Sequence, residues 1–381
     1  MPDRDYDDSV TNYIALAVPL FFLAIGAELV LARRRARKVY RFSDAISDLS
    51  CGMTSQVFVL FFAAAQLALY TWLYEHHRLV TLPLAASWLL AFVGLDFLYY
   101  WWHRASHEVN ALWALHIVHH QSEDYNFAVA LRQSILTSWT ALAFYSPLAL
   151  LGVPPVVYAS TLAFSTLYQF WIHTQLVRKF SGPLDWVFNL PSHHRVHHAI
   201  NPEYLDKNYG ATLIVWDRLF GTYEEEIAPP VYGITKPLGS FNAAWANVHY
   251  FVEMAKMAHA APRFLDKLRV GWKSPAWAPE GLPKPLLNQV SPDTYQKFDP
   301  VASTSTQTYV AIQFVIVVAA TFTLMMWQSK IPPIVVLTLS AMIVLALVSF
   351  AALLEGRRSG KPFEIGRLVI LAGACVWLSL R

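Results

Sequence analysis

Hydrophobic positions along the chain form long uninterrupted runs, and most polar positions lie in the stretches between them. An α-helix needs about 20 consecutive apolar residues to cross a bilayer. Five runs are long enough, and we predict a membrane-spanning helix for each: Tyr13–Ala32, Val57–Tyr74, Leu82–Trp102, Tyr309–Trp327 and Ile331–Leu354. The composition, with 55% hydrophobic and 14% charged residues among 381, agrees. The expected fold is an all-α, polytopic helical bundle in a membrane.

Two other apolar stretches are harder to assign. Ser134–Ile172 is interrupted by Pro147, Pro154 and Pro155, so we predict two helices that turn back within or near the membrane. Leu368–Leu380 is short for a span. It is either a tilted last helix or an interfacial one, and its length leaves both open.

The charges around the first run predict the orientation of the bundle. An acidic leader precedes this run, so we read it as an anchor and not as a cleaved signal peptide. The densest basic cluster follows it: Arg33, Arg34, Arg35, Arg37, Lys38 and Arg41. The positive-inside rule puts this cluster in the cytoplasm. Counting crossings from there places both histidine-rich segments at the cytoplasmic face.

Composition divides the chain into four parts. Mixed, proline-rich sequence runs from Ser181 to about Ser305, and we read Pro229–Pro300 as an irregular cytoplasmic cap or linker. The expected parts are N-terminal membrane helices (1–80), a catalytic core (81–228), the linker or cap (229–305) and C-terminal membrane helices (306–381). Cys51 and Cys375 are too few and too far apart for a disulfide framework or a thiolate metal site. No basic and aromatic interleaving indicates a nucleic-acid partner.

Histidines cluster first in the window HRASHEVNALWALHIVHH. His103 and His107 are four residues apart, and His116, His119 and His120 follow at i, i+3 and i+4. On a helix, each of these sets faces one way.

The second window reads SHHRVHH. His194, His197 and His198 repeat the i, i+3, i+4 spacing, but His193 and His197 are also four apart, so spacing alone leaves the register ambiguous. Together the two windows hold nine of the fourteen histidines, where an even scatter would place about one. A lone His173 ends the predicted hairpin at the same membrane face.

These histidines suit two metal ions. One ion takes about four to six donors, so eight or nine imidazoles are too many for one. Imidazole binds Zn, Cu, Fe or Ni, and the lack of thiolates argues against a structural zinc site. The position at the lipid boundary favours iron and oxygen activation, although zinc could replace iron in a crystal. A purely structural role is disfavoured, because so many buried imidazoles would be costly and mutually repulsive.

Other polar residues near the windows have weaker signals. Asp96 lies seven residues before His103 inside a predicted span, and we expect it to accept a hydrogen bond from a ligand N–H. Glu108, beside His107, is a second candidate catalytic carboxylate. Tyr99–Trp102 is read as an interfacial aromatic belt. We expect the remaining histidines to be interfacial: His76, His77, His249 and His259.

The motifs resemble the fatty acid hydroxylase and sterol desaturase superfamily, membrane di-iron enzymes with HxxxH, HxxHH and HxxHH boxes. The stretches WALHIVHHQSEDYN, ALRQS, LYQFWIHTQ, NLPSHHRVHH, DKNYG and WDRLFGTYEEE, between Phe92 and Glu226, are most similar to its alkylglycerol monooxygenase branch. This resemblance assigns the boxes to His103 and His107, to His116, His119 and His120, and to His194, His197 and His198. It also matches His173 to an isolated histidine of the superfamily, and Glu108 to an acidic residue of that branch.

The resemblance implies an O2-dependent lipid monooxygenase that cleaves alkylglycerol ethers to a fatty aldehyde and a glycerol derivative. It also implies two iron ions, with tetrahydrobiopterin or an external donor supplying electrons. One alternative is a hydroxylase or desaturase acting on a fatty acyl, sterol-like or aminolipid substrate. Another is a divalent-metal transporter, whose site would lie near the bilayer midplane and not past the helix ends.

Overall fold

The computed structural model describes residues 13–284 and 290–379, and each regular element named within those ranges is a helix. In chain order the helices are α1 (Tyr13–Arg34), α2 (Phe42–His77), α3 (Leu84–Glu108), α4 (Asn110–His120), α5 (Phe127–Ala130), α6 (Thr137–Leu150), α7 (Pro155–Trp171), α8 (Pro183–Val187), α9 (Pro191–His197), α10 (Val215–Phe220), α11 (Ala243–Ala260), α12 (Phe264–Trp272), α13 (Thr304–Trp327), a short 3₁₀ helix (Gln328–Lys330), α14 (Pro333–Leu354) and α15 (Gly360–Ser379). The predicted all-α class is confirmed.

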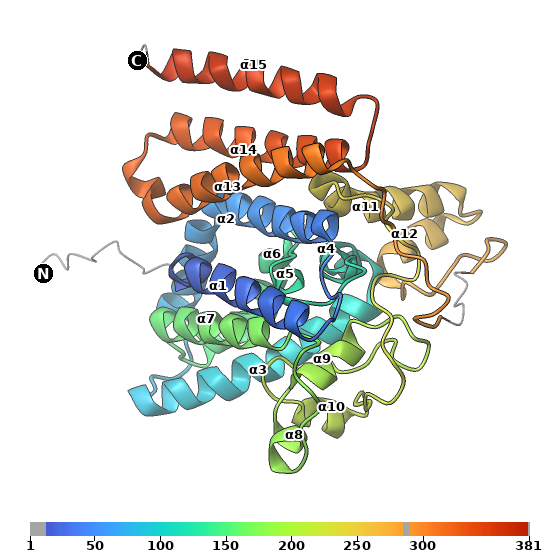
Figure 1. The fold of residues 1–381 in the computed structure, drawn as a ribbon. Helices are drawn as coiled ribbons and strands as arrows, with labels where there is room; N and C mark the ends of the chain where they lie inside the picture. The colour runs from blue at the N-terminus through green and yellow to red at the C-terminus, as the bar shows by residue number, and fades with distance from the viewer. Residues whose placement is uncertain (1–12, 285–289, 380–381) are drawn as a thin grey trace, which may run out of the picture.

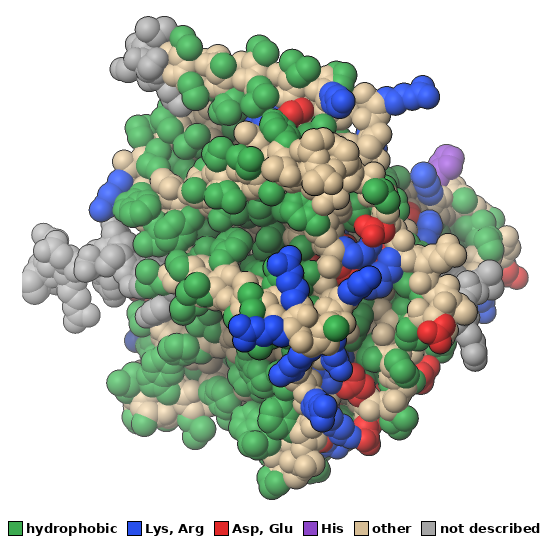
Figure 2. Space-filling view, viewed as in Figure 1, with side chains coloured by type: hydrophobic (Ala, Val, Ile, Leu, Met, Phe, Trp, Pro, Cys, Tyr) green, Lys and Arg blue, Asp and Glu red, His purple; other side chains and the backbone are tan. Residues whose placement is uncertain are grey.

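Five of these helices are long and apolar enough to cross a membrane: α1, α2, α3, α13 and α14. Each covers nearly all of one predicted apolar run, and the long helices lie side by side in Figure 1. Hydrophobic side chains cover the face they form in Figure 2. The prediction of a polytopic membrane protein is therefore confirmed.

Helix α2 starts well before its apolar run. Its first turns carry buried polar residues, among them Asp44, Ser47 and Asp48, before the apolar part begins near Val57. Arg132 donates hydrogen bonds to Ser47 and Asp48, which satisfies these groups inside the protein. The amino-terminal turns of α2 thus extend the membrane bundle toward the histidines.

The proline-interrupted stretch forms the expected pair of helices, α6 and α7, which pack against α2 and α3. At the turn Gly152 has φ +84°, and an added Cβ would lie 2.3 Å from the carbonyl oxygen of Val80. Glycine is therefore needed here. Tyr70 of α2 stacks on Tyr158 of α7 at 4.0 Å between ring centroids.

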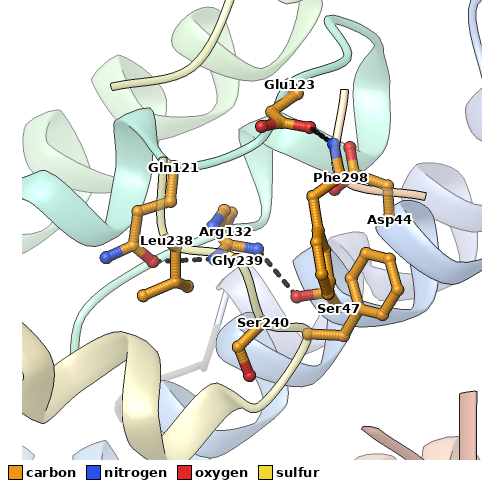
Figure 3. Close-up of a pocket in the computed structure, with 10 residues that line it drawn as sticks. Asp44, Ser47, Gln121, Glu123, Arg132, Leu238, Gly239, Ser240 and Phe298 are labelled. Atoms are coloured by element: carbon orange, nitrogen blue, oxygen red, sulfur yellow. Dashed lines mark hydrogen bonds between the residues drawn. The ribbon is translucent and has the colours of Figure 1, made fainter. Parts of the chain in front are cut away.

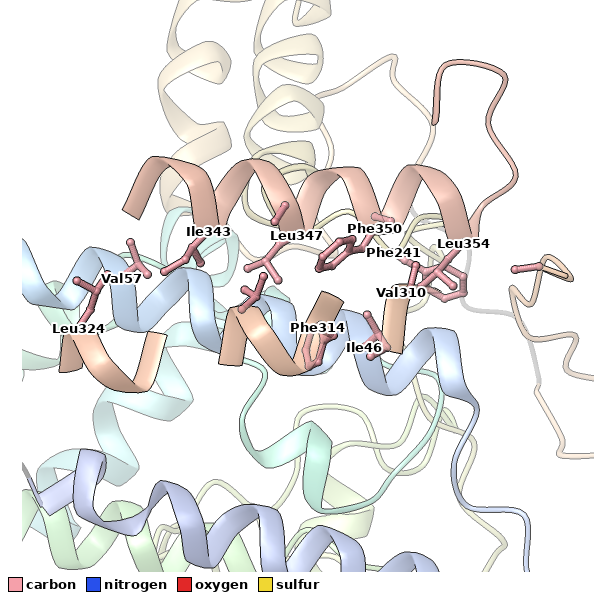
Figure 4. Packing of buried hydrophobic residues seen from close by; sticks show 14 of the residues in the cluster. Ile46, Val57, Phe241, Val310, Phe314, Leu324, Ile343, Leu347, Phe350 and Leu354 are labelled. Atoms are coloured by element: carbon pink, nitrogen blue, oxygen red, sulfur yellow. The ribbon is translucent and has the colours of Figure 1, made fainter. Parts of the chain in front are cut away.

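The C-terminal helices form a separate apolar core. Residues of α2, α13 and α14 interdigitate in Figure 4, with Phe314 and Phe350 both buried. Helix α15 packs along α14 and contains most of the run Leu368–Leu380, whose last residue lies outside the described ranges. Its first turns carry a buried ion pair between Glu364 and Arg367.

The region read as an irregular cap or linker is partly helical, so the expectation of irregular structure is wrong. Helices α11 and α12 lie within it and pack on each other and on α4. Buried Ala243 and Ala246 of α11 contact Cys51 of α2 and Val118 of α4, which explains how this proline-rich segment holds a long helix.

The basic loop after α1 lies at the same end of the bundle as the histidine-bearing segments. Arg35 and Arg37 donate to the carbonyl oxygens of Leu176 and Gln175, just after His173. Arg41 pairs with Asp124, four residues after His120. Figure 2 shows lysine and arginine side chains gathered where α1 ends.

Candidate metal centre

Four segments, from three separate parts of the sequence, bring nine histidines together at this end of the bundle. The last turns of α3 carry His103 and His107, α4 carries three, His173 follows α7, and α9 with its C-cap carries three more. All nine are buried, with exposures of 8% or less. They are the nine expected from the sequence: His103, His107, His116, His119, His120, His173, His194, His197 and His198.

The nine rings form two groups, each with ligand atoms within 4.8 Å of one another. The five-histidine group consists of His103, His107, His116, His120 and His197. The four-histidine group consists of His119, His173, His194 and His198. The groups adjoin, since the rings of His120 and His198 stack with centroids 4.4 Å apart. Two ions could therefore bind close together.

Backbone carbonyls orient several of these rings. Four histidines place Nδ1 within hydrogen-bonding distance of a carbonyl oxygen: His103 with Tyr209 at 2.8 Å, His119 with Arg132 at 2.9 Å, His173 with Gln169 at 2.7 Å and His197 with Lys207 at 2.9 Å. A carbonyl only accepts, so we assign the proton to Nδ1 in each ring. The Nε2 lone pair then points into the cluster, as a metal ligand requires.

The Nε2 atoms themselves indicate that a cation fits. His119 and His173 both carry their proton on Nδ1, yet their Nε2 atoms lie 3.3 Å apart. Two lone pairs facing at this distance repel each other unless a cation accepts both. In the five-histidine group the Nε2 atoms of His107 and His197 are buried without a protein partner. Such groups are costly to bury unless something binds them.

Burial keeps the imidazoles neutral. Desolvation lowers the pKa of His119 to about 4 and that of His197 to about 3, against an ordinary value of 6.5. The same cause lowers the pKa of His116, His120 and His198 well below 6.5. The rings are thus unprotonated lone-pair donors near neutral pH, the form that binds metals.

His193 lies outside both groups. Its Nδ1 accepts a hydrogen bond from the Leu190 N–H at 3.2 Å, and its Nε2 lies 3.2 Å from an Asp185 oxygen. It therefore stabilises the start of α9, while His194 points into the four-histidine group. The structure thus agrees with the register in which His194 belongs to the box.

Asp96 was expected to accept a hydrogen bond from a ligand histidine, but its partners are other groups. Its carboxylate accepts from the backbone N–H groups of Thr212 and Leu213, at 2.8 and 3.2 Å, and from Trp216 Nε1 at 2.9 Å. Backbone carbonyl oxygens accept the hydrogen bonds from the histidine rings instead. One of these carbonyls belongs to Tyr209, and Asp96 binds the loop that contains it. The expected hydrogen bond to a ligand ring is therefore wrong, and the role we now assign to Asp96 is positioning.

The loop from Tyr209 to Leu213 is held closely. Asp217 accepts from the N–H groups of Tyr209 and Gly210 at 2.7 and 2.8 Å. A Cβ on Gly210 would lie 2.4 Å from the Leu213 carbonyl oxygen, so no side chain fits there. Backbone contacts of this loop thus fix the Tyr209 carbonyl that orients His103.

Glu108 lies at the edge of the centre. Its side chain is 48% exposed and accepts from Arg104 Nε at 2.9 Å. Asp206 is the carboxylate nearest to a clustered histidine, with Oδ1 3.7 Å from His107 Nδ1. The two acidic residues therefore border the five-histidine group at its exposed edge.

Two buried charged residues were missed in the sequence. Glu28 of α1 accepts from the Phe127 N–H at 2.9 Å and from the Thr174 hydroxyl, next to His173. A carboxylate inside an apolar run is itself a signal. Arg132 donates to Asp48 and to the Val118 carbonyl. It also donates to Gln121, a hydrogen bond drawn in Figure 3, and thus braces α4.

An apolar cavity of about 240 Å³ lies between α3 and α7. Its lining residues are Trp88, Phe92, Leu95, Asp96, Thr161, Phe164, Ser165, Tyr168 and Thr212. Trp88 and Phe92 belong to a spanning helix and are partly exposed on the outer surface. One turn beyond Leu95, Tyr99 packs against the His103 ring at 5.1 Å between centroids. Tyr99 therefore lies on α3 between the lining residue Leu95 and the ring of His103.

Comparison with known proteins agrees with this picture. The family model described as fatty acid hydroxylase matches residues 88–222. The chain is 40% identical to alkylglycerol monooxygenase of Homo sapiens over 95% of its own length and 82% of the human protein. It is 38% identical to the Danio rerio protein of that name, over 96% and 82%. The similarity therefore extends well beyond the motifs between Phe92 and Glu226.

A more distant relative is an ornithine lipid hydroxylase of Rhizobium tropici, 31% identical over 39% of this chain and 44% of that protein. No solved structure matches the chain.

Proposed function

The chain belongs to the alkylglycerol monooxygenase family, and we propose from this premise that it hydroxylates the ether-bearing carbon of an alkylglycerol lipid. The observation that carries the proposal is the pair of adjoining, buried, all-imidazole groups at the end of the membrane bundle. We assign the nine histidines of these groups as ligands of two iron ions. Iron bound there would supply the activation of O2.

The chain's own residues prepare the site. Backbone carbonyls fix the rings of His103, His119, His173 and His197, so little reorganisation is needed when metals bind. Burial of the whole cluster excludes bulk water from the reacting atoms. We assign Asp96 and Glu108 supporting roles, Asp96 through the loop at Tyr209 and Glu108 at the exposed edge.

The proposed reaction inserts one atom of O2 into the C–H bond next to the ether oxygen. The other oxygen atom leaves as water, with two electrons and two protons taken from a donor. We propose that the donor is a reduced pterin, such as tetrahydrobiopterin, or an external electron-transfer partner. The product is a hemiacetal, which separates into a fatty aldehyde and a glycerol derivative.

Position in the membrane favours an ether carbon as the target. The histidines lie in the last turns of the spanning helix α3 and at the same end of the bundle, and an ether carbon lies just below a lipid head group. Such a carbon needs little displacement to reach them, and we propose that the alkyl chain occupies the cavity between α3 and α7. The basic loop lies at the same end, so the positive-inside rule supports a cytoplasmic active site.

Hydroxylation of an acyl lipid is the second candidate, because 39% of the chain also resembles an ornithine lipid hydroxylase. The two candidates differ in their products. Matched alkyl-ether and acyl lipids are incubated with the enzyme, O2 and reduced pterin, and the products are followed by mass spectrometry. We expect fatty aldehyde from the ether lipid. Hydroxy-acyl product without aldehyde, under every reductant tried, would contradict ether cleavage.

The cavity assignment has its own test on α7. Ser165→Leu fills the cavity, whereas Thr166→Leu adds similar bulk at an exposed neighbouring position. We expect Ser165→Leu to shift the preference toward shorter alkyl chains and Thr166→Leu to leave it unchanged. Identical chain-length profiles for both variants would remove the cavity from the proposal without affecting the reaction itself.

A further inference from the structure

The helix α12 exposes an apolar face outside the membrane-spanning helices. Phe264, Leu265, Leu268 and Trp272 are 72%, 61%, 56% and 79% exposed. At 3.6 residues per turn, these four positions fall within about 100° of arc. The opposite side is buried, at Asp266 and Val270.

Basic residues border this face. On the helical wheel Lys267 lies on one side of it and Arg269 on the other, and Lys273 follows the last turn. All three are exposed. An apolar stripe containing Phe, Leu and Trp between cationic residues is the pattern of a helix that lies in a membrane interface.

Helix α11 also exposes large apolar side chains. Trp245, Val248 and Phe251 recur at i, i+3 and i+6 and are 42%, 49% and 39% exposed. Helices α11 and α12 pack on each other. Seven large apolar side chains, exposed on neighbouring helices, exceed the scattered exposure that a soluble surface normally shows.

Hydrogen bonds anchor this pair of helices beside the ends of two spanning helices. Asn110, two residues after the spanning helix α3 ends, donates from its backbone N–H to the Lys273 carbonyl at 2.9 Å and from its side chain to the Val270 carbonyl at 2.8 Å. At the start of α11, Ser240 donates to Glu355, directly after the end of the spanning helix α14. Both ends of the pair are therefore anchored beside the ends of spanning helices.

We propose that the exposed apolar face of α11 and α12 lies in the head-group and acyl boundary of the same membrane, with Lys267 and Lys273 toward lipid phosphates. The continuity with two spanning helices and the flanking cations select lipid as the occupant. This inference does not depend on the reaction. Asn110 begins α4, which carries three of the clustered histidines. Its hydrogen bonds to Val270 and Lys273 therefore connect the proposed lipid-binding face to the metal centre.

The test uses the full chain in nanodiscs that hold one copy each. An environment-sensitive fluorophore is attached at Leu268→Cys in a Cys375→Ser background, since Cys51 is buried and should not label. Lipids carry a nitroxide quencher either near the head group or near the chain end. Glu203→Cys, an exposed position away from α11 and α12, is the aqueous control, and Ile316→Cys on α13 is the control for the bilayer interior.

For the Leu268 label we expect quenching by the shallow nitroxide at least about twice that by the deep one, because such a face sits about 5–10 Å into the boundary. The Ile316 label should favour the deep quencher, and the Glu203 label should respond to neither. A Leu268 label that behaves like the Glu203 label would overturn the proposal. So would a lipid-like signal that arises only in discs holding two copies, because the face would then be a contact between chains.

Discussion

The histidine end of the molecule and the C-terminal core of α13 and α14 are both fully buried, but they are filled in opposite ways. In the C-terminal core apolar side chains such as Phe314 and Phe350 contact one another. At the histidine end the buried groups are imidazoles, carboxylates and a guanidinium. There the buried side chains are held by specific hydrogen bonds and not by apolar packing, as between Arg132 and Asp48 at 3.1 Å.

Both regions therefore stabilise the fold, but only the histidine end carries groups that we assign to the reaction. The apolar core contributes packing that many side chains share. The polar end contributes directed bonds, each of which orients one group for chemistry. Variants in the C-terminal core should therefore lose folded molecules but keep their activity per folded molecule. Variants at the histidine end should lose activity when a metal ligand is removed and stability when a bracing ion pair is broken.

The largest expected effect is from His194→Ala. Removing a ligand should reduce turnover by more than the roughly 10–100-fold loss that follows removal of an outer-shell partner. The folded fraction in detergent should change little. Turnover is measured as aldehyde release and folding as monodispersity on size-exclusion chromatography.

His193→Ala is the matched control, one residue away and equally buried. It should keep most activity, because His193 only braces the start of α9. Equal inactivation of the two variants would remove the basis for the register.

Arg132→Met should destabilise the protein by about 3–5 kcal/mol, since it leaves a buried carboxylate without its partner. The double variant Arg132→Met with Asp48→Asn should regain much of that loss. Thermal unfolding in detergent measures both. A single variant as stable as the parent would show that this pair does not brace α4.

Phe350→Ala should cost about 3 kcal/mol through the cavity it leaves in the C-terminal core. Activity per folded molecule should stay near that of the parent, because α14 carries none of the clustered histidines. Aldehyde release is normalised to the monodisperse fraction. A large loss of normalised activity would show that the C-terminal core is coupled to the reaction, which contradicts the distinction between the two regions.

Acid should destabilise the metal-free protein through its buried histidines. His119 and His197 have folded pKa values of about 4 and 3, below the unfolded value of about 6.5, so the unfolded chain binds more protons in that window. Stability is full above pH 6.5 and is lost as pH falls toward 4, by about 1.4 kcal/mol per pH unit for each such histidine. Melting temperatures of chelator-treated protein between pH 8 and 5 provide the measurement, and a flat profile would contradict it.

Much of this arrangement is readable from the sequence because it rests on local patterns. Apolar runs locate the spanning helices, and spacing within the two windows selects the histidines. Residues such as Glu28 and Arg132 act across the fold, and their partners lie far away in sequence. Asp96 was assigned the wrong partner because helical spacing placed it below His103, while the loop that actually binds it follows more than a hundred residues later.

Helices α11 and α12 escaped prediction for another reason. Prolines before and after them gave the segment the composition of a linker. Their stabilising contacts are tertiary, such as the hydrogen bond from Tyr250 to Asn110 at 2.5 Å. A strong amphipathic stripe in α12 is the local signal that could have revealed them.

The central claim is that the two imidazole groups bind two metal ions, and metal content tests it most directly. Protein purified anaerobically from iron-supplemented cells is analysed for metals, beside His173→Ala, which removes a ligand from the four-histidine group alone. We expect about two iron atoms per chain in the parent and close to one in the variant. One metal or none in the active parent, or a variant that keeps both, would contradict the assignment of two adjoining ions.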